Sequence, residues 1–217
     1  MFHLIFDMNM EFSRKARIFA NRAMADAPSS LTYYSVVSSD SGSVGLFIAD
    51  LNDLDIMAWD VGNSHLNEPC QENIWFAAGP EHGPGGTGNV VVVIRGLYGL
   101  NSSGASWRKM FAETLIHMEF VPTVADPNVY HIQAMTPNGE DYYELLVVYV
   151  DDVICCWHNP QLIMDALALK YDLKYKLVGP PKIYFGAEIN KYQVRIGKCH
   201  WSMSSTQSVN NAIKMVG

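Results

Sequence analysis

Cysteine is scarce in this sequence and forms no pattern typical of metal binding or of a disulfide framework. The 217 residues contain four cysteines, and no two of them have the spacing Cys-x-x-Cys. Structural zinc sites and redox-active pairs depend on such spacings, and small secreted domains depend on many paired cysteines. We therefore expect a reduced, intracellular protein.

Long apolar runs are also lacking. No stretch approaches the ~18–20 consecutive apolar residues that a membrane-spanning helix needs. The short apolar start, from Met1 to Phe6, is interrupted by Asp7, so it does not resemble a signal peptide. Because 49% of the residues are nevertheless hydrophobic, the composition is that of a globular protein.

Basic residues are few. Lys and Arg number 15 against 22 Asp and Glu, which gives a net charge of −7. Proteins that bind phosphate backbones usually carry a basic face, so the total charge predicts weak binding of nucleic acid by this chain alone. A basic groove is still compatible with an acidic total, because the bases are clustered. The clusters are Arg14, Lys15 and Arg17; Arg108 and Lys109; and Lys170, Lys174 and Lys176.

Hydrophobic patterning predicts helices and strands in no regular alternation. Trp107, Phe111, Leu115 and Met118 recur at helical spacing and predict one helix. Further helices are predicted at 44–52, from Pro160 to about Lys176, and at 204–215. Strands are predicted at 55–61, 90–94, 129–133, 145–150, 153–157, 182–189 and 192–196, with 90–94 expected to be buried. A Gly- and Pro-rich loop is predicted at 79–89 and a hairpin turn at 137–139. This order favours an α+β fold in which an antiparallel sheet packs against helices.

The segment Tyr149-Val150-Asp151-Asp152 places two adjacent carboxylates between two apolar strands. If these strands pair, both acids lie at the turn of a buried hairpin. One explanation is purely structural, because aspartate is a favourable turn residue. The other is that the acids serve chemistry at the end of the hairpin.

A third carboxylate makes the chemical explanation stronger. Asp60 ends the apolar strand that contains Ile56 and Trp59. If that strand lies beside the hairpin, three carboxylates come together, and their mutual repulsion favours cations between them. Mg²⁺ prefers oxygen ligands, and two such ions ~3.5–4 Å apart stabilise the attacking and leaving oxygens of phosphoryl transfer.

Six segments resemble, in the same order, the motifs of reverse transcriptases from copia-type LTR retrotransposons. They cover nearly the whole chain and include the box YVDD, which is the family's catalytic motif. The segments, each with the family motif it resembles, are 13–20 (SRKARIFA, YKARLVAKG), 59–67 (WDVGNSHLN, LDVKTAFLNG), 96–101 followed by Trp107 (GLYGLN, LYGLKQAPRQW), 120–130 (FVPTVADPNVY, GFxxSxxDPCLY), 149–152 (YVDD) and 177–189 (LVGPPKIYFGAEI, LGxxKYFLGIEI).

The resemblance implies a palm-and-fingers polymerase that extends a primer with dNTPs on an RNA or DNA template. About 1–55 and 62–105 would be fingers-like, and about 56–61 and 106–217 palm-like. No RNase H, integrase or protease segment is expected in this chain. Such a protein would act in the cytoplasm, within a virus-like particle, or in the nucleus.

The family's functional residues carry over to matching positions of this sequence. Asp60 and Asp151 would bind both Mg²⁺ (or Mn²⁺) ions, and Asp152 would complete the acidic triad. The resemblance places two further groups of residues beside the substrates, although Lys15, Arg17 and Lys182 can also be read as ordinary surface bases. The nucleotide-binding group is Lys15, Arg17, Val61, His65, Gly99 and Asn101, and the primer/template group is Tyr149 and Lys182.

Two positions depart from the family pattern. His65 stands where the family usually has Phe or Tyr, which excludes the 2′-hydroxyl of ribonucleotides, and Asn101 stands where it has Lys. Together with the acidic net charge, these departures leave an alternative open: a catalytically silent, reverse-transcriptase-derived protein with a structural or binding role and a capacity for self-association. A metal-dependent nuclease is a third reading, and the ordered polymerase motifs speak against it.

Overall fold

The computed structural model describes residues 2–8, 14–20, 35–174, 179–181, 183–184, 187–195, 198–206, 209–210 and 213. The chain forms two compact units. The first unit comprises Met1–Tyr34 and Asn63–Thr114, and the second unit comprises Ser35–Gly62 and Leu115–Gly217. In the described part of the chain, no helix has the length and apolar character that a membrane span requires.

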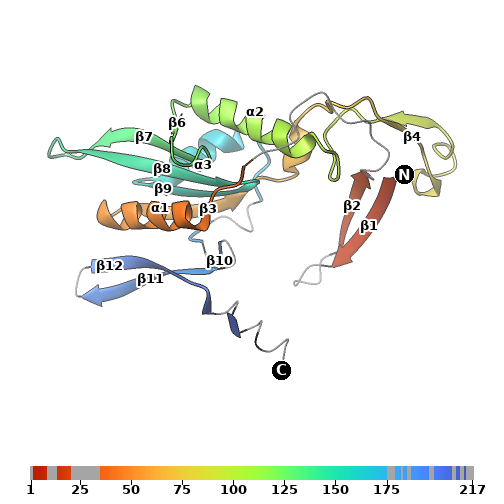
Figure 1. The fold of residues 1–217 in the computed structure, drawn as a ribbon. Helices are drawn as coiled ribbons and strands as arrows, with labels where there is room; N and C mark the ends of the chain where they lie inside the picture. The colour runs from red at the N-terminus through yellow and green to blue at the C-terminus, as the bar shows by residue number, and fades with distance from the viewer. Residues whose placement is uncertain are drawn as a thin grey trace. The chain divides into compact units, whose positions relative to one another are not determined.

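The second unit is built on a five-stranded antiparallel sheet (Figure 1). Two inner strands, β8 (Asp141–Tyr149) and β9 (Asp152–Trp157), contain runs of buried apolar residues at 145–148 and 153–156, because both faces are covered there. The strand order is β3 (Asp55–Asp60), β9 (Asp152–Trp157), β8 (Asp141–Tyr149), β7 (Val129–Met135) and β6 (Val121–Pro122).

One face of this sheet is covered by α1 (Ser39–Leu51) together with a small second sheet. That sheet has the order β10 (Ile183–Tyr184), β11 (Ala187–Arg195) and β12 (Lys198–Ser204). Leu46 of α1 and Ile189 of β11 share one buried cluster with Val147 of the large sheet. Figure 1 shows α3 (Pro160–Ala168) on the opposite side of the sheet, where Met164 and Leu167 are buried.

The two edge strands of the large sheet are each covered or interrupted. At β3, Ala58 exchanges two backbone hydrogen bonds with Gly179, at 2.8 and 3.2 Å. Further along the same edge, Val61 forms a bridge with Leu173. At the opposite edge, β6 is two residues long and contains Pro122, which has no N–H to donate.

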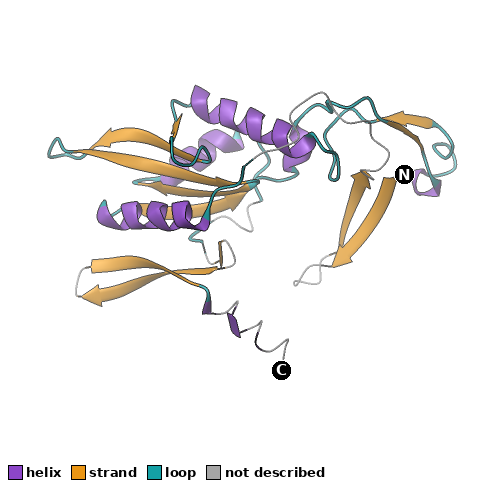
Figure 2. Cartoon of the chain, in the orientation of Figure 1, coloured by secondary structure: helices purple, strands orange, loops and turns teal. Residues whose placement is uncertain are grey.

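The first unit contains two separate hairpins (Figure 2). Strand β1 (Phe2–Met8) pairs with β2 (Arg14–Ala20), and β4 (Trp75–Ala77) pairs with β5 (Val90–Val92). Two 3-10 turns, η2 (Ser64–Asn67) and η3 (Pro80–His82), lie between these strands in the sequence. Helix α2 (Ser103–His117) begins in the first unit, where Trp107 and Phe111 stack with their ring centroids 5.1 Å apart.

The mixture of helices and antiparallel strands agrees with the predicted α+β class, but three local predictions were wrong. The helix expected to reach Lys176 ends at Ala168, because Leu173 pairs with the edge of the sheet; Lys176 itself lies outside the described residues. The strand expected at 182–189 is divided into β10 and β11, which pair with each other. The residues at 90–94 form a shorter strand that is exposed, with Ile94 74% accessible, because a two-stranded hairpin has no second layer over one of its faces.

Strand β12 was not predicted at all, although its sequence, KCHWSMS, alternates regularly between polar and apolar residues. Half of the helix predicted at 204–215 lies outside the described residues.

Candidate active site

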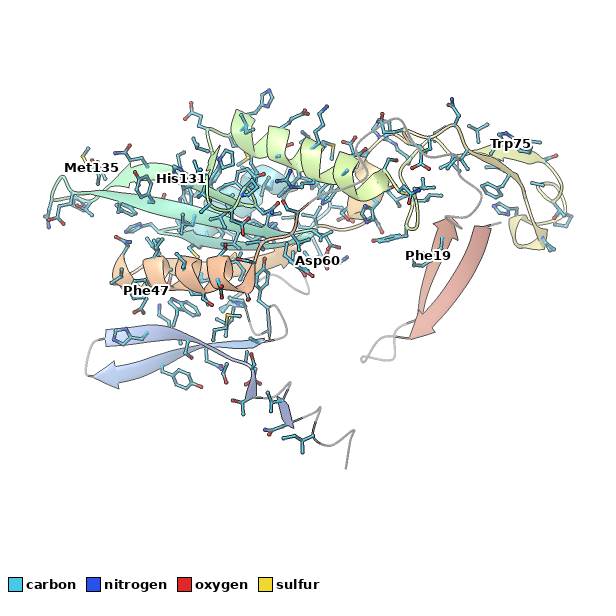
Figure 3. All side chains as sticks on the ribbon, in the orientation of Figure 1. Phe19, Phe47, Asp60, Trp75, His131 and Met135 are labelled. Carbon is cyan, nitrogen blue, oxygen red and sulfur yellow. The ribbon has the colours of Figure 1, made fainter. Side chains whose placement is uncertain are left out.

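Asp60 and Asp152 are direct cross-strand partners at one end of the large sheet. Strands β3 and β9 pair in a register that aligns Asp55 with Trp157 and ends by aligning Asp60 with Asp152. Figure 3 shows Asp60 at this end of the sheet, and Met135 at the other. The prediction that the two acid-bearing strands are neighbours is therefore confirmed.

Asp151 lies in the turn next to this pair. Strands β8 and β9 are joined by Val150 and Asp151, since Tyr149 and Asp152 are the last paired residues. Val150 has a φ of 59°, a conformation that costs a β-branched residue ~1–3 kcal/mol. The backbone N–H of Val61 donates to the carbonyl of Asp151 at 2.8 Å, so β3 fixes the turn from the side.

The three carboxylates influence one another. Burial raises the pKa of Asp152, and the nearby charges of Asp151 and Asp60 raise it further, to about 6, against the opposing effect of Lys174. Repulsion of this kind is the electrostatic signature of a site that favours cations. The carboxylate of Asp152 is therefore only partly ionised near pH 6 in the cation-free protein.

Lys174 supplies a cation to this cluster. Its Nζ lies 2.5 Å from Oδ1 of Asp60, and its backbone N–H donates to the carbonyl of Asp60 at 3.0 Å. The sequence placed Lys174 only in a basic cluster and not among the site residues. Its position follows from the end of α3 at Ala168, which allows the following residues to run along the edge of β3.

Gly62 allows this edge segment to approach closely. Its N–H donates to the carbonyl of Asp172 at 2.6 Å, and a Cβ at position 62 would lie 2.9 Å from that same oxygen. Real Cβ atoms do not come so close to a backbone oxygen, so glycine keeps the segment from Asp172 to Lys174 beside Asp60.

Tyr184 supports the hairpin from the core and was also missed by the sequence analysis. Its hydroxyl lies 3.3 Å from the carbonyl of Val147 and 3.4 Å from that of Asp152. Burial raises the pKa of this tyrosine well above its usual value, so it remains a neutral donor. A tyrosine within a predicted strand carried no signal for this role.

The other predicted residues of the second unit differ in accessibility. Val61 is completely buried, so its side chain has no surface to offer a nucleotide, whereas Tyr149 is 37% exposed. Lys182 lies outside the described residues.

Two of the predicted nucleotide-binding residues of the first unit, His65 and Gly99, lie beside Tyr98. The ring of His65 meets the ring of Tyr98 edge-on at 4.8 Å, and Phe19 of β2 forms a bridge with Tyr98. Gly99 has a φ of 90°, which favours glycine, and Asn101 lies just before α2. Lys15 and Arg17 belong to the same strand as Phe19, but their side chains lie outside the described part of the structure.

The chemistry of the acidic cluster fits a divalent cation. Its donors are carboxylate oxygens, which Mg²⁺ prefers, and the ammonium of Lys174 already acts as a stand-in positive charge at Asp60. Among the described residues, no three His, Cys, Asp or Glu side chains converge as the ligands of one ion. Because the ammonium of Lys174 contacts Oδ1 of Asp60, a cation could bind that oxygen only after this ion pair opens.

Comparison with known proteins identifies the family of the chain. The family model for reverse transcriptase (RNA-dependent DNA polymerase) matches residues 5–212. The chain belongs to the reverse transcriptase family. This reverse transcriptase is also similar to the retrovirus-related Pol polyprotein from transposon RE1 of Arabidopsis thaliana, with 26% identity over 147 residues. The match covers 66% of this chain and 10% of that polyprotein, so the chain spans about a tenth of the length of its relative. Both matches identify a reverse transcriptase of the copia type, as the motifs predicted.

Proposed function

We propose that this reverse transcriptase chain is an RNA-directed DNA polymerase core that extends a primer with dNTPs by two-metal catalysis. The observation that carries the proposal is the register of β3 and β9, which pairs Asp60 with Asp152 next to Asp151 in the adjoining turn. The rise in the pKa of Asp152 supports it, because the cluster lacks enough positive charge for three ionised carboxylates.

The reaction would join the 3′ oxygen of the primer to the α-phosphorus of a dNTP. The bond between that phosphorus and the oxygen bridging to the β-phosphate would break, and pyrophosphate would leave. Divalent cations, when bound, would activate the 3′ hydroxyl and neutralise charge on the phosphates. Asp60, Asp151 and Asp152 would hold these cations, and the backbone bond from Val61 to Asp151 would keep the turn in place during the reaction.

Residues of the first unit would contribute nucleotide binding. Lys15 and Arg17 of β2 would hold the triphosphate, and His65, Gly99 and Asn101 would lie beside the nucleotide. Because His65 replaces the usual aromatic residue, we propose that this copy discriminates weakly against ribonucleotides. Tyr149 and Lys182 would contact primer and template. The reaction would take place in a cytoplasmic virus-like particle or in the nucleus.

Primer extension tests the proposal. The chain is incubated with a DNA primer on an RNA template, dNTPs and Mg²⁺ at low salt, and compared with Asp151→Asn/Asp152→Asn. The matched control is Asp141→Asn/Asp165→Asn, which removes the same charge at exposed positions of the same unit. We expect extension by the wild type and the control only. Extension that persists in Asp151→Asn/Asp152→Asn would refute the assignment of these acids.

A second candidate function is a catalytically silent role that depends on self-association. It is favoured by exposed apolar side chains on the β4–β5 hairpin, where Trp75 pairs with Val92, and just past β5 at Ile94, which is 74% exposed. Trp75 and Val92 are 68% and 63% exposed, and Figure 3 labels Trp75 on β4. Patches of this kind commonly mark sites of association.

Sedimentation separates the two functions. A silent, associating protein would show no extension, and Trp75→Ser/Ile94→Ser would reduce its mass in solution to that of a monomer. A wild type that is monomeric at every concentration would exclude the second candidate.

A further inference from the structure

Lys174 and a divalent cation would compete for the same oxygen of Asp60. The ammonium lies 2.5 Å from Oδ1, and a bound Mg²⁺ would need an oxygen at ~2.0–2.1 Å. An ammonium and a divalent cation that both contact this one oxygen would lie close together and would repel each other strongly. Only one of them can therefore occupy Oδ1 of Asp60 at a time.

The backbone of Lys174 is anchored independently of its side chain. Its N–H donates to the carbonyl of Asp60 at 3.0 Å, Leu173 forms a bridge with Val61, and Gly62 donates to Asp172. None of these contacts involves the ammonium. The side chain can consequently leave Oδ1 while the segment stays on the edge of β3, and its four methylene groups give it the freedom to do so.

We propose that Lys174 is a positioning residue that holds the Asp60 carboxylate in the cation-free enzyme and is displaced from Oδ1 when a divalent cation binds. The ammonium offsets part of the repulsion among Asp60, Asp151 and Asp152, which keeps the ends of β3 and of the β8–β9 hairpin paired before the cation arrives. The inference rests on the metal-binding part of the proposed function.

A purely structural ion pair would behave differently. If Lys174 only tied the edge segment to β3, its ammonium would stay on Asp60 whether or not a cation was present. The two readings therefore differ in one observable, the accessibility of the Lys174 amine with and without metal.

The first experiment measures this accessibility in the wild-type protein. The chain is acetylated briefly with acetic anhydride in EDTA or in Mn²⁺, and the modified lysines are quantified by mass spectrometry. Lys170 is the internal control, because it lies over the ring of Tyr171 and not in the acidic cluster. Chymotryptic cleavage after Tyr171 separates the two lysines, and fragment ions distinguish Lys174 from Lys176.

We expect Mn²⁺ to increase the modification of Lys174 and to leave that of Lys170 unchanged. Binding of Mn²⁺ is checked by titration in the same buffer. If Mn²⁺ binds and the acetylation of Lys174 does not change, the proposal is overturned.

The second experiment measures affinity for Mn²⁺ by calorimetry. Lys174→Met removes the competing cation, and Lys170→Met removes a charge of the same sign four residues earlier. For a pair that is 44% exposed at the lysine, we expect Lys174→Met to bind Mn²⁺ about fivefold more tightly than the wild type. Lys170→Met should bind Mn²⁺ with nearly unchanged affinity. If both variants gained affinity equally, the gain would come from the change in net charge alone, and the proposal would be overturned.

Failure of this proposal and failure of the polymerase function give different results. A chain that binds Mn²⁺ and exposes Lys174 but does not extend primers supports the exchange and contradicts the polymerase function. A chain that extends primers while Lys174 stays protected in Mn²⁺ supports the polymerase function and contradicts the exchange.

Discussion

The backbone N–H of Val61 donates to the carbonyl of Asp151 at 2.8 Å. Val61 directly follows β3, and Asp151 lies in the turn between β8 and β9, so this bond continues the pairing of β3 past Asp60. The turn is consequently held by β3, on the β9 side of the hairpin. This explains how Val150 can adopt a φ of 59°, which a free hairpin of the same sequence would avoid.

Replacing Val150 by glycine should relieve that conformation. We expect Val150→Gly to raise the free energy of unfolding by about 1 kcal/mol, since relief of ~1–3 kcal/mol exceeds the entropic cost of glycine. Val148→Gly, at a buried position of β8 two residues before the turn residue Val150, should instead lower it by about 3 kcal/mol. Urea denaturation followed by tryptophan fluorescence measures both, and destabilisation by Val150→Gly would show that Val150 is not strained.

Asp152 makes stability depend on pH. Because its pKa is raised in the folded state, to about 6, the native protein binds more protons than the unfolded chain between about pH 4 and pH 6. Stability from this residue is complete below the unfolded pKa and declines as the pH rises through 6. In EDTA at pH 7.5, Asp152→Asn should therefore raise the free energy of unfolding by about 1 kcal/mol, after discounting for solvent screening.

The gain in Asp152→Asn should vanish below about pH 4, where the wild-type carboxyl is protonated in both states. Asp141→Asn, at the exposed start of β8, is the control and should change stability little at either pH. A gain in Asp152→Asn that is equally large at acid pH would disprove the electrostatic origin.

Asp126 ties the start of α1 to the segment before β7. Its Oδ2 accepts from the N–H of Ser38 at 3.1 Å and from the hydroxyl of Ser41 at 2.7 Å, and its Oδ1 accepts from the N–H of Asn128 at 3.0 Å. Burial raises the pKa of Asp126, but these hydrogen bonds outweigh it and the net shift is downward. Asp126→Ala should lower the free energy of unfolding by about 2 kcal/mol at pH 7.

A lowered pKa means that this contribution is present above the unfolded pKa and is lost as the pH falls through the folded one. The difference between Asp126→Ala and the wild type should therefore shrink in strong acid, in urea titrations at pH 7 and at pH 2. Asp40→Ala removes a carboxylate from the first turn of α1 and should cost at most about 0.5 kcal/mol. Equal losses in the two variants would assign the effect to the helix dipole.

Gly62 should not tolerate a side chain. Gly62→Ala brings a methyl group within 2.9 Å of the carbonyl of Asp172, so we expect a loss of about 2 kcal/mol in the free energy of unfolding. Gly85→Ala is the matched control, because a Cβ there meets no atom within 4 Å. If the two variants unfold at the same urea concentration, the close approach of Gly62 to Asp172 is not present in solution.

The acid-bearing strands could be predicted from the sequence because each is short and largely apolar, with an aspartate at the end of β3 and at the start of β9. The helix around Trp107 and Phe111 was equally clear from its spacing. These features depend on local patterning, which one sequence contains in full.

The position of Lys174 could not be predicted, because it depends on which edge of the sheet receives the chain after α3. The apolar run 166–169 favoured a longer helix, but Leu173 instead forms a bridge with Val61 at the edge of the sheet. The exposed face of β5 was missed for a related reason: a β-branched run indicates a strand but does not indicate whether another layer covers it.

The edges of the large sheet have a consequence for how the protein behaves when it is crowded. One edge ends in Pro122, and at the other edge Leu173 pairs with Val61 and Gly179 pairs with Ala58. A strand from a neighbouring molecule therefore finds few free backbone amides in a continuous row along these edges. Amyloid growth adds strands by such in-line bonding. A protein with a large apolar sheet is in this way restrained from seeding fibrils when many copies are confined in a small space.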